Sequence, residues 1–141
     1  MLDTQTFRSI IKELIPFNRL LGLRLDTFDI NTGDVTTRLD MRPEYLGNAG
    51  RAMPHGGLLS FLIDATAGAS AALSLEDPSL IDRIATIDMR VDYLKPAKGD
   101  VLLTSSEVMR SGNRVINVRS ELRDDVGTLV ALGSNTFNVA R

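Results

Sequence analysis

The stretch MPHGGLLSFLIDATAGASAAL, residues Met53–Leu73, decides the architecture of this 141-residue chain. Nearly every position in it is small or apolar, and one acid, Asp64, lies in the middle. A helix that is apolar almost all round must be covered on most sides. The stretch is about long enough to cross a membrane, but Ala, Gly and Ser outnumber Leu and Ile, and a central carboxylate is costly in a bilayer. The sequence therefore predicts a buried core helix rather than a membrane span.

The composition is that of an ordinary globular protein, with 43% hydrophobic residues, 24% charged residues and a net charge of −2. That balance gives no electrostatic reason to expect nucleic acid or an anionic membrane as a partner. The chain has no cysteine and one histidine, so a disulfide framework, a cysteine nucleophile and a metal site are not expected. The first ten residues, MLDTQTFRSI, lack the pattern of a signal peptide. We expect one domain over residues 1–141, a cytoplasmic location and no cofactor.

The segments around the long helix are typical of strands and turns. A short amphipathic helix is predicted over residues 4–17, because apolar side chains recur there at helical spacing. A hairpin is predicted over residues 21–41, and four further strands over 84–94, 101–110, 114–123 and 128–139. Apolar and polar side chains alternate in VINVRSEL, which is typical of a sheet with one covered face. The economical arrangement is an α+β fold, a curved antiparallel sheet wrapped around the helix, with a second subunit covering what the sheet leaves open.

These features together resemble the hotdog fold and, more narrowly, acyl-CoA thioesterases of the phenylacetic-acid-degradation type. The matching residues are His55–Gly57, the acid eight positions after Gly56, and TIDMRVDYLKPAKGD at Thr86–Asp100. The resemblance covers nearly the whole chain and implies hydrolysis of an acyl-CoA thioester. It also implies a homodimer, two of which pair into a tetramer, with active sites at the dimer interface. It leaves the acyl group open.

Thioester hydrolysis passes through a tetrahedral oxyanion, so a hydrogen-bond donor must face the developing charge. The first-turn N–H groups at Gly56 and Gly57 lack intrahelical acceptors and lie at the positive end of the helix dipole. The resemblance implies the Gly56 N–H as the oxyanion donor, with His55 and Gly57 beside the substrate. The alternative is that the two glycines only permit tight packing at a helix start. We expect His55 to be a cap or a structural contact rather than a base.

Asp64 is the candidate for the other half of the chemistry. Its carboxylate could attack the thioester carbonyl or activate a water molecule; alternatively, it is a structural acid bonded to a neighbouring strand or chain. Eight residues at a rise of ~1.5 Å separate Gly56 from Asp64 by roughly 12 Å along the helix axis. One carbonyl cannot be polarised at Gly56 and attacked from Asp64 of the same helix. The two groups are therefore expected to come from different subunits.

Supporting roles follow from the resemblance for three more residues. Thr86 matches a Ser or Thr that steadies the acid or the water, although β propensity alone also explains a Thr in a strand. The family carries an Asn or Gln six positions before the His, where this chain has Ala49, so Asn48, one position earlier, is the candidate. Asp88 is expected to anchor structure.

Coenzyme A carries phosphates, and four basic residues match the segments that hold it in the family: Lys95, Lys98, Arg110 and Arg114. Solvated surface charge is the alternative explanation for each of them.

Two other functions remain open at this stage. A non-catalytic acyl-CoA binding or regulatory hotdog domain would not need Asp64. A hotdog hydratase or dehydratase would use a His and an acid over the alkyl carbons, whereas the one His here belongs to the Gly-Gly motif.

Overall fold

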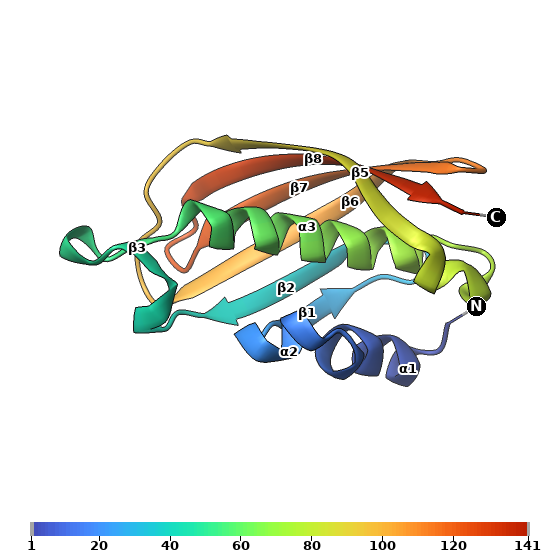
Figure 1. Ribbon diagram of the computed structural model, residues 1–141, viewed down its shortest axis with the longest axis horizontal. Coiled ribbons are helices and arrows are strands. Elements are labelled where there is room, and N and C mark those ends of the chain that lie inside the picture. Colours follow the sequence, from blue (N-terminus) through green and yellow to red (C-terminus); the bar gives the residue numbers. More distant parts are fainter. Residues whose placement is uncertain (1, 141) are drawn as a thin grey trace.

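The computed structural model describes residues 2–140. The long helix α3 (Gly56–Leu73) lies against a six-stranded antiparallel sheet, which curves around it (Figure 1). The predicted core helix is confirmed, and it begins directly after His55, which has extended backbone angles. By length and composition α3 would suit a membrane span, but 61% of that stretch is buried inside the molecule. It is therefore the core helix of the fold.

The sheet has the strand order β1-β2-β6-β7-β8-β5, so β1 and β5 form its two edges. The strands are β1 (Arg24–Phe28), β2 (Val35–Asp40), β5 (Ile84–Tyr93), β6 (Val101–Ser111), β7 (Val115–Asp124) and β8 (Leu129–Val139). The four long strands agree with the predicted ranges to within one residue at each end. The alternation in β7 is also confirmed, since Ile116, Val118, Ser120 and Leu122 are all buried. The hotdog architecture expected from the sequence is the one observed.

The N-terminal segment is more broken than the single predicted helix. It forms α1 (Thr4–Ser9), a π-helical turn η1 (Ile10–Leu14) and α2 (Pro16–Leu21). Pro16 can begin a helix but cannot continue one, which separates α2 from the preceding turn. The buried Asn18 side chain donates from Nδ2 to the Ile11 carbonyl (3.0 Å), so the interruption does not leave that acceptor unpaired. The segment lies along α3 on the side of β1 (Figure 1).

The connections at both ends of α3 also carry short elements. Before the helix lie η2 (Pro43–Tyr45), β3 (Leu46–Asn48), η3 (Ala49–Arg51) and β4 (Met53–Pro54), with β3 and β4 paired. After it lies η4 (Pro78–Arg83). The small hairpin packs directly on the helix start, since a Cβ on Gly47 would lie 2.9 Å from the His55 Cα. The hairpin therefore lies directly against the backbone of His55.

Candidate active site

The start of α3 offers one free backbone donor. His55 caps the helix, and its Nδ1 accepts a hydrogen bond from the Gly57 N–H (2.8 Å). This confirms the cap role for His55, and it gives the Gly57 N–H a side-chain acceptor. The Gly56 N–H has no acceptor among residues 2–140. It remains the candidate oxyanion donor at the positive end of the helix.

Tyr93, at the end of β5, borders this donor. Its hydroxyl hydrogen-bonds to Ser60 Oγ and lies 3.2 Å from the Gly56 carbonyl oxygen. A Cβ on Gly56 would lie 3.7 Å from the nearest Tyr93 ring atom, which is ordinary van der Waals contact. Tyr93 and Ser60 were absent from the predicted site, although Tyr93 belongs to the segment that carried the family resemblance. A small side chain at position 56 would therefore fit at the helix start, beside the exposed side chain of Tyr93.

Asp64 has one oxygen held and the other free. Its Oδ1 accepts hydrogen bonds from Thr86 Oγ1 (2.9 Å) and from Asn135 Nδ2 (2.9 Å). Its Oδ2 has no hydrogen-bond partner in the described part of the chain. Asn135 was absent from the predicted site, because it lies 71 positions from Asp64 and only the order of the strands brings β8 there. The arrangement leaves one carboxylate oxygen available for chemistry.

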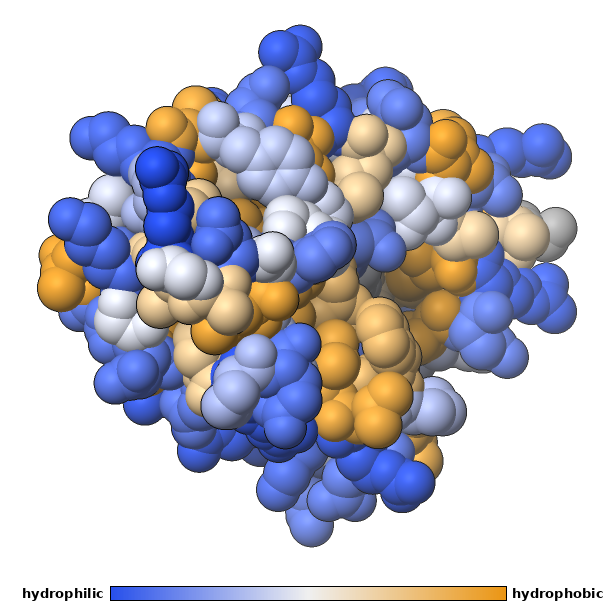
Figure 2. Space-filling view, turned by 60° about the vertical axis from the view of Figure 1, so that its left-hand side comes forward, coloured by the Kyte–Doolittle hydropathy of each residue, from blue (hydrophilic) through white to orange (hydrophobic). Residues whose placement is uncertain are grey.

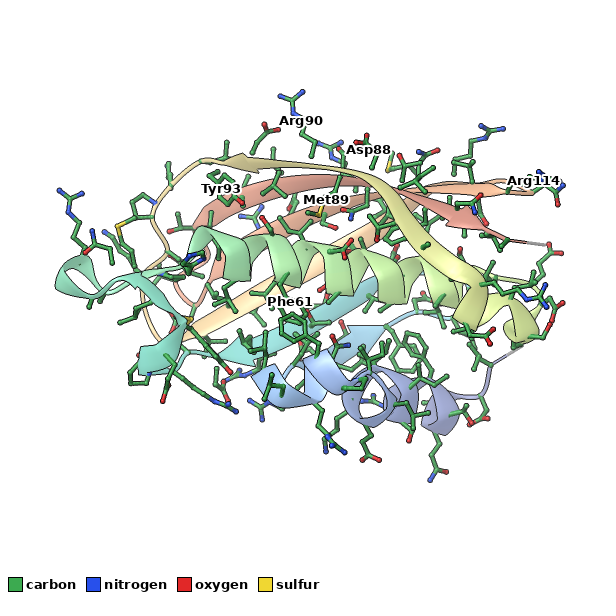
Figure 3. The ribbon with its side chains drawn as sticks, viewed as in Figure 1. Phe61, Asp88, Met89, Arg90, Tyr93 and Arg114 are labelled. Atoms are coloured by element: carbon green, nitrogen blue, oxygen red, sulfur yellow. The ribbon has the colours of Figure 1, made fainter. Side chains whose placement is uncertain are left out.

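A β-bulge in β5 decides which of its side chains reach α3. Ile87 has no partner in the register between β5 and β8, so the alternation of faces shifts there. Thr86 before it and Met89 after it both line the space beside Asp64. In Figure 3, Met89 lies on the helix side of β5 and Asp88 on the opposite side. Asp88 is exposed and forms no hydrogen bond or ion pair within residues 2–140, so its expected anchoring role stays a prediction.

An apolar cavity of about 540 Å³ opens beside Asp64. Its walls come from α3, the N-terminal segment, η4, β5 and β8, and Gly57 and Gly68 contribute to the α3 wall. The rings of Phe17 and Phe61 meet edge to face across it, with centroids 4.8 Å apart. Figure 2 shows apolar side chains gathered around a hollow on the face that it presents. The volume lies in the range of roughly 300–1,000 Å³ that is typical of small-molecule sites.

Asn48 belongs to the Gly56 end of the site rather than to Asp64. It lies in the small hairpin, and its Oδ1 accepts a hydrogen bond from the Arg51 N–H (3.2 Å), which caps η3. Its Nδ2 has no acceptor among the described residues. The predicted site residues therefore divide into two groups, Asn48, His55, Gly56 and Gly57 at the helix start, and Thr86 with Asp64 near its middle.

The groups that could hold phosphates or a metal are dispersed within one subunit. Lys95 and Lys98 follow β5, at the end of the sheet where the Lys98 N–H donates to Asp124 Oδ2 (3.0 Å). Arg110 and Arg114 flank the turn between β6 and β7 at the opposite end, where Figure 3 labels Arg114. The part of β6 from Val101 to Arg110 separates the two pairs, a distance of roughly 30 Å. Within residues 2–140, no group of three or more His, Asp or Glu side chains is arranged to hold a metal ion.

Comparisons with known proteins agree on one family. Residues 54–131 match the family described as Thioesterase superfamily. The chain is 30% identical to the medium/long-chain acyl-CoA thioesterase YigI of Escherichia coli K12, over 89% of this chain and 86% of the relative. A Shewanella oneidensis protein related to the thioesterase superfamily superposes with a TM-score of 0.84 and 34% identity, covering 96% of this chain and 94% of that one. A Bacillus halodurans protein solved with CoA superposes with a TM-score of 0.74 and 25% identity, covering 89% and 78%. The chain belongs to the thioesterase superfamily and is a thioester hydrolase with the hotdog fold.

Proposed function

We propose that this protein hydrolyses acyl-CoA to the free acid and coenzyme A at a site shared between two subunits. The observation that carries the proposal is the separation of the two reactive groups on one helix. The free N–H of Gly56 and the free Oδ2 of Asp64 are eight residues apart on α3, roughly 12 Å along its axis. A thioester carbonyl within reach of both needs Gly56 from one subunit and Asp64 from its partner.

The chemistry then follows from the two free groups. In the water route, Asp64 Oδ2 takes a proton from water while the water oxygen bonds to the thioester carbon. The carbonyl oxygen becomes an oxyanion and accepts a hydrogen bond from the Gly56 N–H. Collapse of the intermediate breaks the C–S bond, and the departing CoA thiolate takes the proton. In the nucleophile route, Oδ2 bonds to the carbon itself, CoA leaves, and water hydrolyses the resulting anhydride. Both routes require the same oxygen to be free.

The edge strand β5 supports the pairing of two subunits. Within residues 2–140 it has a neighbouring strand on one side only, and its exposed apolar side chains include Ile87, Met89 and Tyr93. An exposed apolar strand at a sheet edge is normally covered in the native assembly. Antiparallel pairing of two copies across this edge would bring the helix start of each toward the Asp64 of the other. It would also bring the Lys95 and Lys98 end of one sheet toward the Arg110 and Arg114 end of its partner, where the CoA phosphates need positive charge.

The apolar cavity supports a substrate with an extended hydrocarbon chain. Asp64 and Thr86 lie in its wall, so an acyl group inside it has its carbonyl carbon near the free carboxylate oxygen. The Escherichia coli relative is named for medium- and long-chain acyl-CoA, and the Bacillus halodurans structure contains CoA. We propose a medium- or long-chain acyl group for this protein as well.

The test is release of free CoA from a panel of acyl-CoA substrates, followed with a thiol reagent. Aryl-acetyl, benzoyl and straight acyl chains of increasing length are compared at equal concentration. We expect turnover with medium and long chains and its loss in the Asp64→Asn variant. Tight binding of acyl-CoA without release of thiol would instead identify an acyl-CoA binding module. Modification of the acyl chain without release of thiol would identify a hydratase or dehydratase.

A further inference from the structure

We infer that Asn135 on β8 is a positioning residue for hydrolysis, one that orients the Asp64 carboxylate so that its free oxygen faces the substrate. The inference rests on the proposed function, since it assumes that Asp64 performs the chemistry. Asn135 is 2% exposed, and its Nδ2 lies 2.9 Å from Asp64 Oδ1. No substrate reaches so deeply buried an amide except through Asp64.

Two donors from neighbouring strands fix the carboxylate. Thr86 on β5 and Asn135 on β8 both donate to the same oxygen, Oδ1. A carboxylate held by one donor can still rotate about its χ2 torsion, whereas two donors that approach from different strands define the plane of the group. Oδ2 then has a fixed direction. Because the acid lies on a rigid helix and both donors lie in the sheet, the site satisfies the requirement that reactive groups be held by packed supporting residues.

The β-bulge makes this convergence possible. Thr86 pairs with Phe137 of β8, and after the bulge Met89 pairs with Asn135. The extra residue, Ile87, allows Thr86 and Met89 to lie on the same inner face although they are an odd number of positions apart. The two donors therefore lie on adjacent strands, on either side of the bulge, where they meet one oxygen of α3. Bulges often re-aim side chains beside active sites in this way.

Stability alone does not account for an asparagine at this position. The Oδ1 of Asn135 is buried and has no hydrogen-bond partner within the described residues. A buried acceptor without a partner costs folding free energy, and an apolar side chain of similar size would avoid that cost. The amide orientation is set by its neighbour, because turning it over would point Oδ1 at the carboxylate oxygen. The residue therefore leaves one oxygen unpaired while it presents its N–H to Asp64.

The test compares Asn135→Leu with Asn117→Leu as a matched control. Asn117 lies on the neighbouring strand β7 and donates to Thr136 Oγ1 (3.1 Å), away from Asp64. We expect Asn135→Leu to lower kcat about tenfold or more, the usual effect of losing a hydrogen bond to a charged group. KM and the urea midpoint of unfolding should stay near wild type, and the control should keep its kcat. Asn135→Ala, which cannot overpack the site, should lose kcat to a similar extent if the leucine variant fails to fold.

A double-variant cycle separates positioning from a general structural effect. In the Asp64→Asn background, Asn135→Leu should cause no further fall in kcat, because there is no carboxylate left to orient. An equal fall in both backgrounds, or a kcat at the wild-type level in a folded Asn135→Leu variant, would overturn the inference. An active Asp64→Asn single variant would overturn the proposed function together with this inference. The two failures are distinguishable because the first leaves Asp64→Asn inactive.

Discussion

Replacing Asp64 with asparagine removes the reactive oxygen and keeps the shape of the side chain. In the Asp64→Asn variant, the new amide oxygen can still accept hydrogen bonds from Thr86 and Asn135, and the NH₂ group takes the position of Oδ2. The amide can neither take a proton from water nor attack a carbonyl. We expect kcat to fall on the order of a hundredfold or more, the usual contribution of a general base, which corresponds to at least ~2.7 kcal/mol of transition-state stabilisation.

The cost in folding should be small by comparison. Two charge-assisted hydrogen bonds become neutral ones, so the free energy of unfolding should fall by no more than about 1–2 kcal/mol. The assay is release of CoA under saturating substrate, with urea unfolding and light scattering as controls for fold and assembly. A folded, normally assembled Asp64→Asn variant with near-normal turnover would refute the reasoning and make Asp64 a structural acid.

Three further predictions concern the acid's other donor, the acyl cavity and a buried carboxylate. Thr86→Val keeps the shape and removes the second donor to Asp64, so kcat should fall about tenfold with little change in KM; an unchanged kcat would make this hydrogen bond incidental. Gly68→Leu should shorten the longest acyl chain accepted, because Gly68 lines the cavity, and each methylene kept out costs about 0.8 kcal/mol or about fourfold in kcat/KM. Gly68→Ala is the matched control, since its Cβ would make ordinary contact with Phe137 at 3.7 Å; equal losses at all chain lengths would contradict the cavity assignment. Burial alone would raise the pKa of Asp124, but three backbone N–H groups that donate to its carboxylate outweigh that effect and hold the pKa below its ordinary value of 3.8. Its contribution to stability should therefore be complete above about pH 4–5 and lost as the pH falls through the lower folded value; urea midpoints at several pH values should show a smaller acid loss for Asp124→Asn than for wild type.

The sequence predicted the helix and strands whose burial shows as a regular pattern of apolar side chains along consecutive residues. The apolar run at Met53–Leu73 and the alternating strands agree with the structure because burial on one or more faces leaves a periodic signature. The N-terminal segment was predicted as one helix because helical spacing continues through Ile10 and Leu14, whereas the π-helical turn and Pro16 break it in space. Pro16 is itself a local signal for the break, whereas the π-helical turn has no signature in the spacing of the apolar residues.

The candidate site residues that belong to a sequence motif could be proposed from the sequence, whereas a residue that strand register brings beside them could not. Gly56 and Asp64 follow from the helix start and the spacing along α3. Asn135 depends on β8 lying beside β5, and the shared facing of Thr86 and Met89 depends on the bulge at Ile87. A single extra residue in a strand has no signature in composition, so the facing of β5 could be read only from the structure.

The shared site is the central claim, and subunit exchange between two inactive variants tests it most directly. Gly56→Pro removes the proposed oxyanion donor and remains compatible with the first turn of a helix. Gly56→Ala keeps the N–H and fits beside Tyr93 with ordinary contact, so it is the control for the added side chain. Asp64→Asn disables the other half of the site.

The two inactive variants, Gly56→Pro and Asp64→Asn, are mixed in equal amounts, unfolded together and reassembled, and the mixed dimers are verified by mass. Each mixed dimer then has one site with Gly56 and Asp64 intact and one site with both damaged. Random pairing makes about half of the dimers mixed, so roughly a quarter of wild-type activity should return. If Gly56 and Asp64 instead served one site from the same chain, every site would stay defective. Verified mixed dimers that regain no activity would contradict the shared site.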